Sequence, residues 1–138
     1  MILVDTTIWS LALRRKAGSL SSRESALVEE WSRLATAGQA CLTGPIRQEI
    51  LSGIRDAAVF KAIQQILRDF PHVVVIDGDH DRAAEFYNTC RSHGVAGTAV
   101  DMLICAVAAR SDTPIFTTDG DFARYAKYLP LRLHDLSA

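Results

Sequence analysis

Four carboxylate side chains stand at places in the sequence where a fold can bring them together. Asp5 follows the apolar run ILV, Glu49 lies within PIRQEIL, Asp101 begins an otherwise apolar stretch, and Asp119 follows PIFTT. Carboxylates that lie close together raise one another's pKa unless a cation neutralises them. Hard divalent cations such as Mg²⁺ and Mn²⁺ take oxygen ligands, and such ions promote phosphodiester hydrolysis. These residues therefore predict a metal centre that cleaves phosphodiesters.

The same carboxylates also have structural explanations. Thr98 and Asp101 have the spacing of a capping box, in which the Asp101 side chain bonds back to the start of its own helix. The turn DG at Asp119 is typical of an N-cap, and Glu49 taken alone is typical of a solvated helix residue. Asp5 is the exception, because a strand this apolar gains nothing from an acid near its end. The sequence leaves both the metal role and the capping role of Asp101 open.

The elements that must position these acids are strands that alternate with helices. Short apolar runs predict strands at residues 2–7, 40–43, 72–76, 114–118 and 131–134. Between them lie an apolar segment at 8–13 and helical patterns at about 21–37, 45–54, 59–70, 79–93, 99–110 and 120–128. This alternation is typical of a parallel sheet that is covered on both faces. We therefore predict a three-layer α/β/α sandwich with a central parallel sheet.

Such a sheet gathers the acids at one edge. Sites in open parallel sheets form beyond the carboxyl ends of strands, at the point where the strand order reverses. Asp5 and Asp119 follow the first and fourth predicted strands, and Asp101 begins the helix that leads into the fourth. If these two strands are neighbours, these three acids and Glu49 reach one cleft, with Asp121 close by.

Composition bounds the other possibilities. The chain has 138 residues, 49% of them hydrophobic and 22% charged, with a net charge of −1. These values suit a single folded domain over residues 1–138 and exclude a broadly basic nucleic-acid coat. The three cysteines lack metal-ligand spacing, and the N-terminus lacks the pattern of a signal peptide. We expect reduced thiols and a cytoplasmic protein that has no membrane segment.

The segments ILVDTTIW, PIRQEIL, AVDMLICAVA and IFTTDGDF, in this order, resemble the PIN domain, and most closely the VapC-type toxins of bacterial toxin–antitoxin pairs. The resemblance covers essentially the whole chain. It implies an endoribonuclease that depends on Mg²⁺ or Mn²⁺. By position, its catalytic acids are Asp5, Glu49, Asp101 and Asp119, and its metal ligands are Asp5, Asp101 and Asp119.

The resemblance also implies supporting residues and partners. Thr6 and Thr117 would be hydroxyls that order ligands or water, and Asp121 would be an auxiliary acid. The expected partners are an RNA substrate, a small VapB-like antitoxin protein and a second copy of the chain in a homodimer. An aspartyl phosphatase of the haloacid dehalogenase type is disfavoured, because Thr7 stands where it requires a second aspartate. The remaining alternative is a catalytically silent PIN-like binding or regulatory module.

Overall fold

The computed structural model describes residues 1–136 and is built on a parallel sheet. Its strands are β1 (Ile2–Val4), β2 (Ala40–Thr43), β3 (His72–Val73) and β4 (Ile115–Phe116), in the spatial order β3-β2-β1-β4. Leu3 stands opposite both Cys41 of β2 and Ile115 of β4, so β1 is central. The first and fourth strands are therefore neighbours, as the site hypothesis requires, and the strand order reverses between them.

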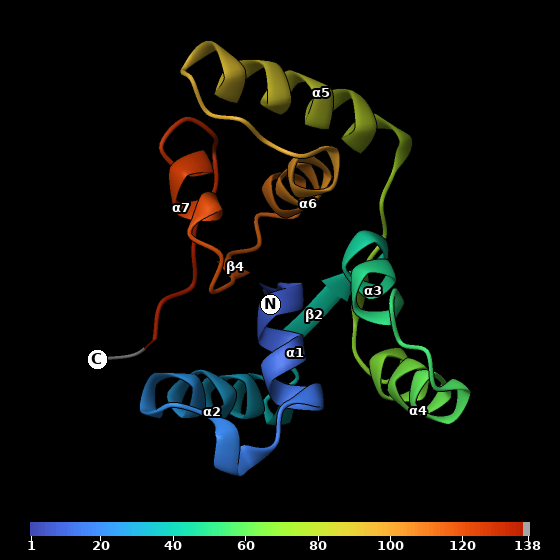
Figure 1. Cartoon of the computed structure of the whole chain (residues 1–138). Helices are drawn as coiled ribbons and strands as arrows, with labels where there is room; N and C mark the ends of the chain where they lie inside the picture. The colour runs from blue at the N-terminus through green and yellow to red at the C-terminus, as the bar shows by residue number, and fades with distance from the viewer. Residues whose placement is uncertain (137–138) are drawn as a thin grey trace.

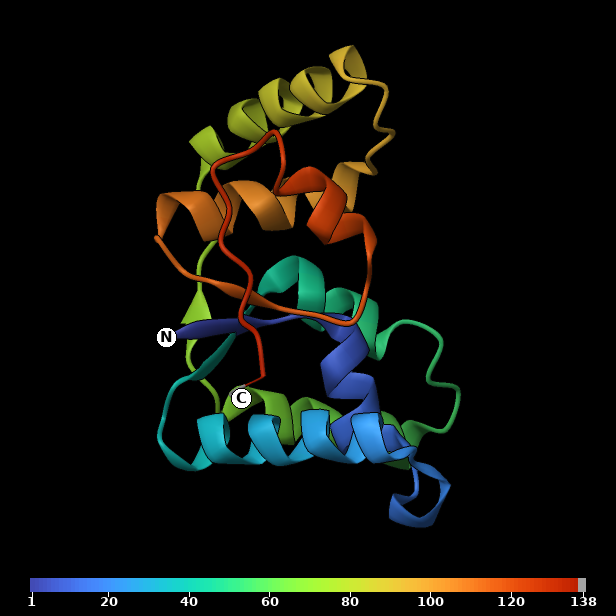
Figure 2. The ribbon, with the colours of Figure 1, turned by 90° about the vertical axis from the view of Figure 1, so that its left-hand side faces the viewer.

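Helices cover both faces of this sheet (Figures 1 and 2). One face is covered by α1 (Thr6–Arg14), α2 (Ser22–Thr36) and α4 (Ala57–Arg68). The other carries α3 (Gly44–Leu51), α6 (Ala99–Arg110) and α7 (Asp121–Tyr125), and α5 (Asp77–Ser92) packs on the outside of α6. The predicted three-layer α/β/α architecture is confirmed.

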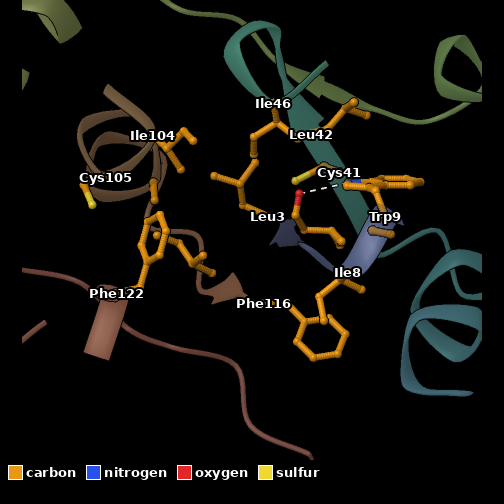
Figure 3. Close-up of a cluster of buried hydrophobic side chains, with 14 of the residues drawn as sticks. Leu3, Ile8, Trp9, Cys41, Leu42, Ile46, Ile104, Cys105, Phe116 and Phe122 are labelled. Atoms are coloured by element: carbon orange, nitrogen blue, oxygen red, sulfur yellow. Dashed lines mark hydrogen bonds between the residues drawn. The ribbon is translucent and has the colours of Figure 1, made fainter. Parts of the chain in front are cut away.

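The strands are apolar throughout because both of their faces are buried. Figure 3 shows Leu3 and Leu42 between side chains of α1 and side chains of α6 such as Ile104. Trp9 of α1 is fully buried, and its indole N–H donates to the Val4 carbonyl oxygen at 2.9 Å. This bond satisfies the one polar group of the ring. It also ties α1 to β1 and so fixes the turn at Asp5 between them.

Most predicted strands are shorter in the structure, as β3 and β4 are within the ranges 72–76 and 114–118, and one is absent. The strand predicted at 2–7 ends at Val4, because Asp5 occupies the N-cap position of α1, a helix that covers the apolar segment 8–13. The strand predicted at 131–134 is wrong, since this segment makes one isolated bridge, between Leu133 and Ile115. Its neighbour β4 is only two residues long and offers little backbone to pair with.

Local signals for helix starts are confirmed in detail. The Ser21 hydroxyl accepts from the Glu24 amide at 3.1 Å, and the Glu24 carboxylate accepts from the Ser21 amide at 2.9 Å, which completes a capping box. Pro45 lies in the first turn of α3, where its missing N–H costs least. These signals place α2 and α3, and α3 in turn carries Glu49.

The cysteines are structural. Cys41, Cys90 and Cys105 are buried and unpaired, as expected for reduced thiols. Burial raises the pKa of all three thiols, that of Cys41 to about 11, so they stay protonated at neutral pH. Within residues 1–136, every helix is too short or too polar to cross a bilayer.

Candidate active site

The acids predicted for the site, which we call the acidic group, are Asp5, Glu49, Asp101, Asp119 and Asp121. Asp5 is its buried member. It lies between β1 and α1, and only 5% of its surface is exposed. Its Oδ2 accepts hydrogen bonds from Thr117 Oγ1 at 2.8 Å and from Thr7 Oγ1 at 3.3 Å. Burial raises the pKa of the Asp5 carboxyl, and the Thr117 bond lowers it by less. The two hydroxyls thus fix the orientation of an acid that its surroundings make costly to ionise.

The loop after β4 is tied to the same hydroxyls. Thr117 Oγ1 accepts from the Asp119 amide at 2.9 Å while it donates to Asp5, so it bridges the two acids. Thr7 Oγ1 accepts from the Thr118 amide at 3.0 Å. Thr117 thus joins the Asp5 carboxylate to the backbone at Asp119, and its role in ordering a metal ligand or water stays a prediction. Sequence reasoning missed Thr7, whose only indication is its place in the first turn of α1, two residues after Asp5.

Asp101 lies in the first turn of α6, where its backbone and its side chain have different partners. Thr98 Oγ1 accepts from the Asp101 amide at 3.0 Å, so Thr98 caps the helix. The Asp101 carboxylate accepts from the Tyr125 hydroxyl of α7 at 2.8 Å. Burial raises the pKa of the Asp101 carboxyl, the Tyr125 bond lowers it, and the charges of Asp119 and Asp5 raise it again. The Thr98 side chain therefore caps the helix. The Asp101 carboxylate is directed to Tyr125 and lies near the other acids.

Tyr125 was not identified from the sequence. It is 1% exposed, and burial followed by its bond to Asp101 raises its pKa, so the hydroxyl remains a donor at neutral pH. The sequence places Tyr125 only within the predicted helix at 120–128, and in the structure its ring occupies the core beside Phe122. A buried tyrosine hydroxyl needs a polar partner. That requirement was the one indication available.

Carboxylate oxygens of Asp101, Asp119 and Asp121 lie within 4.8 Å of one another. Asp119 Oδ1 accepts from the Asp121 amide at 2.9 Å, and Asp121 also forms an ion pair with Arg124. Oxygen atoms alone, from several carboxylates, suit a hard divalent cation. The tight group Asp101, Asp119 and Asp121 includes Asp121, to which the resemblance assigns only an auxiliary role. Asp5 is not part of it but is linked to Asp119 through the Thr117 hydroxyl. The residues present therefore fit a metal centre of the expected kind.

Glu49 completes the site from α3. It is exposed at the rim, and its Oε1 accepts from Thr6 Oγ1 at 3.4 Å. Desolvation raises the pKa of the Glu49 carboxyl, and the charges of Asp5 and Asp101 raise it further. Its charge is thus coupled to theirs. In Figure 2 the end of β1 and the starts of α6 and α7 lie together on the right-hand side.

The sequence and this geometry agree with one family. The family model of the PIN domain matches residues 2–128. The chain belongs to the PIN domain family. Ribonuclease VapC11 of Mycobacterium tuberculosis is 32% identical to it over 136 residues, which cover 96% of each chain. VapC ribonuclease Mb1587 of Mycobacterium bovis matches to the same extent.

Solved structures share this PIN fold at lower identity. FitAcB from Neisseria gonorrhoeae has a TM-score of 0.74 at 18% identity, covering 98% of this chain and 97% of that one. VapBC2 from Rickettsia felis, bound to a DNA fragment from its promoter, has a TM-score of 0.74 at 15% identity and covers 99% and 100%. The sarcin–ricin loop cleaving toxin VapC20 of Mycobacterium tuberculosis has a TM-score of 0.68 at 19% identity and covers 96% and 99%. At these identities the likeness concerns the fold.

Proposed function

We propose that this PIN domain protein is a metal-dependent endoribonuclease that acts as the toxin of a toxin–antitoxin pair. The observation that carries the proposal is the group Asp101, Asp119 and Asp121, within 4.8 Å of one another, where the strand order reverses. Relatives of the same length that are 32% identical are named ribonucleases. A toxin–antitoxin complex from Klebsiella pneumoniae shares the fold with a TM-score of 0.64.

In this proposal, Asp5, Asp101 and Asp119, joined by Asp121, hold Mg²⁺ or Mn²⁺. When bound, such a cation supplies positive charge that activates water and stabilises the leaving oxygen of a phosphodiester. The chain's contribution is to hold the acids in place before the substrate arrives. Asp101 is oriented by its 2.8 Å bond to the Tyr125 hydroxyl, in the way that outer partners commonly orient metal ligands.

Glu49 is the residue we assign to positioning the attacking water. Its raised pKa lies closer to neutral pH than that of an ordinary glutamate, which suits a group that accepts a proton during catalysis. Thr6 engages Oε1 and leaves Oε2 free to face a water molecule. Glu49 stands on a different element from the three acids of the tight group, so it approaches the reaction from another side.

The proposal also covers the organisation and the partners of the protein. We propose a single domain over residues 1–138 that forms a homodimer in the cytoplasm. Its inhibitor is a small VapB-like antitoxin. The acidic group offers this antitoxin an anchor, because an arginine fork pairs with carboxylates through two parallel hydrogen bonds. An arginine inserted there would neutralise the charge that otherwise attracts the cation.

The direct test is RNA cleavage by the purified protein. We expect cleavage with Mg²⁺ or Mn²⁺, none in excess chelator, and none by the Asp119→Asn variant. Asp135→Asn is the matched control, because Asp135 is an exposed carboxylate of the C-terminal segment. Undiminished cleavage in chelator would contradict the metal mechanism. Tight RNA binding without cleavage under any metal condition would support the silent binding module instead.

A further inference from the structure

A groove lined by polar residues and two leucines runs along α1 beside the acidic group. It has a volume of about 520 Å³ and is walled by α1, the start of α2 and the loop after β4. Thr6, Thr7 and Thr118 line it near the acids, and Arg15, Arg23 and the carboxylate of Glu24 line it further away. Thr6 bonds to Glu49 and Thr7 to Asp5, so the groove and the acidic group share a wall. Figure 2 shows α1 leading from the end of β1 to the turn before α2.

The two arginines of the groove keep much of their hydrogen-bonding capacity. Arg15 approaches Glu24 at 3.7 Å, the longest ion pair within residues 1–136, and its side chain is 47% exposed. Arg23 forms no ion pair with any residue in that described range. Arg15 also donates to the Ser19 carbonyl oxygen at 3.5 Å. Both contacts of Arg15 are long, so an incoming anion can replace them and pair with the planar fork of either guanidinium group.

The clustered carboxylates of the site repel the phosphates of an RNA substrate, and the arginines of this groove offset that repulsion. RNA is a polyanion, the chain carries a net charge of −1, and its acids face the substrate. Phosphates on either side of the scissile bond need positive charge from the protein. Arg15 directly follows the last residue of α1 and is nine residues from Thr6, or about 13.5 Å at the helical rise. It is therefore placed for a phosphate that lies away from the acids.

We propose that this groove binds the RNA strand beside the scissile phosphate, and that Arg15 and Arg23 pair with its backbone phosphates. The proposal rests on the ribonuclease function and defines a subsite for its substrate. Hydroxyls of Ser10 and Thr118 add donors of the kind that contact phosphate and sugar oxygens. Contacts of this kind strengthen binding without selecting bases, as in grooves that track a single strand.

The test compares two double variants that lose the same charge. The groove variant is Arg15→Gln with Arg23→Gln, and the control is Arg14→Gln with Arg91→Gln, two exposed arginines outside the groove. Binding of a fluorescent single-stranded oligoribonucleotide is measured by anisotropy in chelator over a range of salt concentrations. The groove variant should bind at least tenfold more weakly. Its slope of log K against log salt should shrink by about 1.4, or about 0.7 for each lost contact with a single strand.

Cleavage gives a second readout. With Mg²⁺ or Mn²⁺, the groove variant should lose about tenfold in kcat/KM on a long RNA and lose less on the shortest oligonucleotide that the wild type cleaves, whereas the control variant should match the wild type on both. If affinity and salt slope match those of the control, the groove proposal is overturned while the ribonuclease function stands. It is also overturned if RNA binding is unchanged and antitoxin binding is lost. RNA binding with the expected arginine dependence but without cleavage would support the groove and refute the proposed function.

Discussion

Repulsion between Asp101 and Asp119 should be measurable as a coupling energy in the metal-free protein. The perturbation is a double-mutant cycle of Asp101→Asn, Asp119→Asn and the combined variant. Each substitution keeps the shape and an acceptor oxygen but removes a charge. Terms that belong to one residue alone cancel in such a cycle, including the Tyr125 bond to Asp101 and the effect of each acid on its own helix. What remains is the interaction between the two carboxylates.

The structure gives its magnitude. The carboxylate oxygens lie within 4.8 Å of each other. At this separation two unit charges interact by about 0.9 kcal/mol in water and by about 3.5 kcal/mol at the effective dielectric constant of about 20 that suits protein surfaces. Both side chains are half-buried, so we expect repulsion to lower the free energy of unfolding by about 1–3.5 kcal/mol at pH 7.

The pH dependence follows from the sign of the shift. The pKa of Asp101 is raised in the folded state, so its protonated form favours folding. That contribution is complete below the unfolded pKa of about 3.9 and is lost as the pH rises through the folded value. The coupling should therefore be present at pH 7 and absent below about pH 4.

The assay is urea denaturation of the four proteins in excess chelator at both pH values, with m-values checked for constancy. A coupling below about 0.3 kcal/mol at pH 7, the usual error for independent sites, would refute the proximity of the charges. A coupling of the same size at both pH values would refute its electrostatic origin. Divalent cation should stabilise the wild type and lose this effect in the combined variant.

Three further predictions concern single residues of the same site. Tyr125→Phe removes the hydroxyl that orients Asp101, so it should weaken Mn²⁺ binding by about 10–100-fold in calorimetry. The control Tyr87→Phe, at an exposed tyrosine of α5, should leave Mn²⁺ binding unchanged. Glu49→Gln should still bind Mn²⁺ but lose the rise in cleavage rate with pH that titration of Glu49 produces; an unchanged pH profile would exclude the role. Wild-type protein expressed alone should arrest growth, while Asp5→Ala, or the wild type with its antitoxin, should not; harmless high expression of the wild type would refute the toxin function.

The parallel sheet and the placement of Asp5 and Asp119 at its edge were predictable, because short segments of sequence indicate both. Asp5 and Asp119 each follow a short apolar run, and a parallel sheet brings the carboxyl ends of such runs to one edge. The strand order that makes β1 and β4 neighbours was only a condition of the hypothesis. It depends on how the helices pack, which no short segment encodes. The strand predicted at 131–134 failed for the related reason that its neighbour β4 proved too short to pair with.

The contacts that hold the acids were harder to foresee. Thr7 and Tyr125 each make a bond across the site to a residue distant in sequence or on another helix. Their sequence patterns, a helix start and an apolar helix face, have ordinary structural meanings that give no reason to look further. Asp121 was identified, but its closeness to Asp101 depends on the turn between β4 and α7. Side-chain partnerships of this kind appear only once the backbone is in place.

The bridge from Thr117 to Asp5 spans 112 residues of sequence, so the first acid of the candidate site to be made is oriented by a residue made 112 positions later. During synthesis at about 5–20 residues per second, the nascent chain carries Asp5 for several seconds before Thr117 exists. Throughout that interval β1 lacks its β4 neighbour, and the acids cannot assemble. On the proposed mechanism, a growing chain therefore cannot cleave RNA before Thr117 is made and in place. An inhibitor needs to reach the protein only after that point.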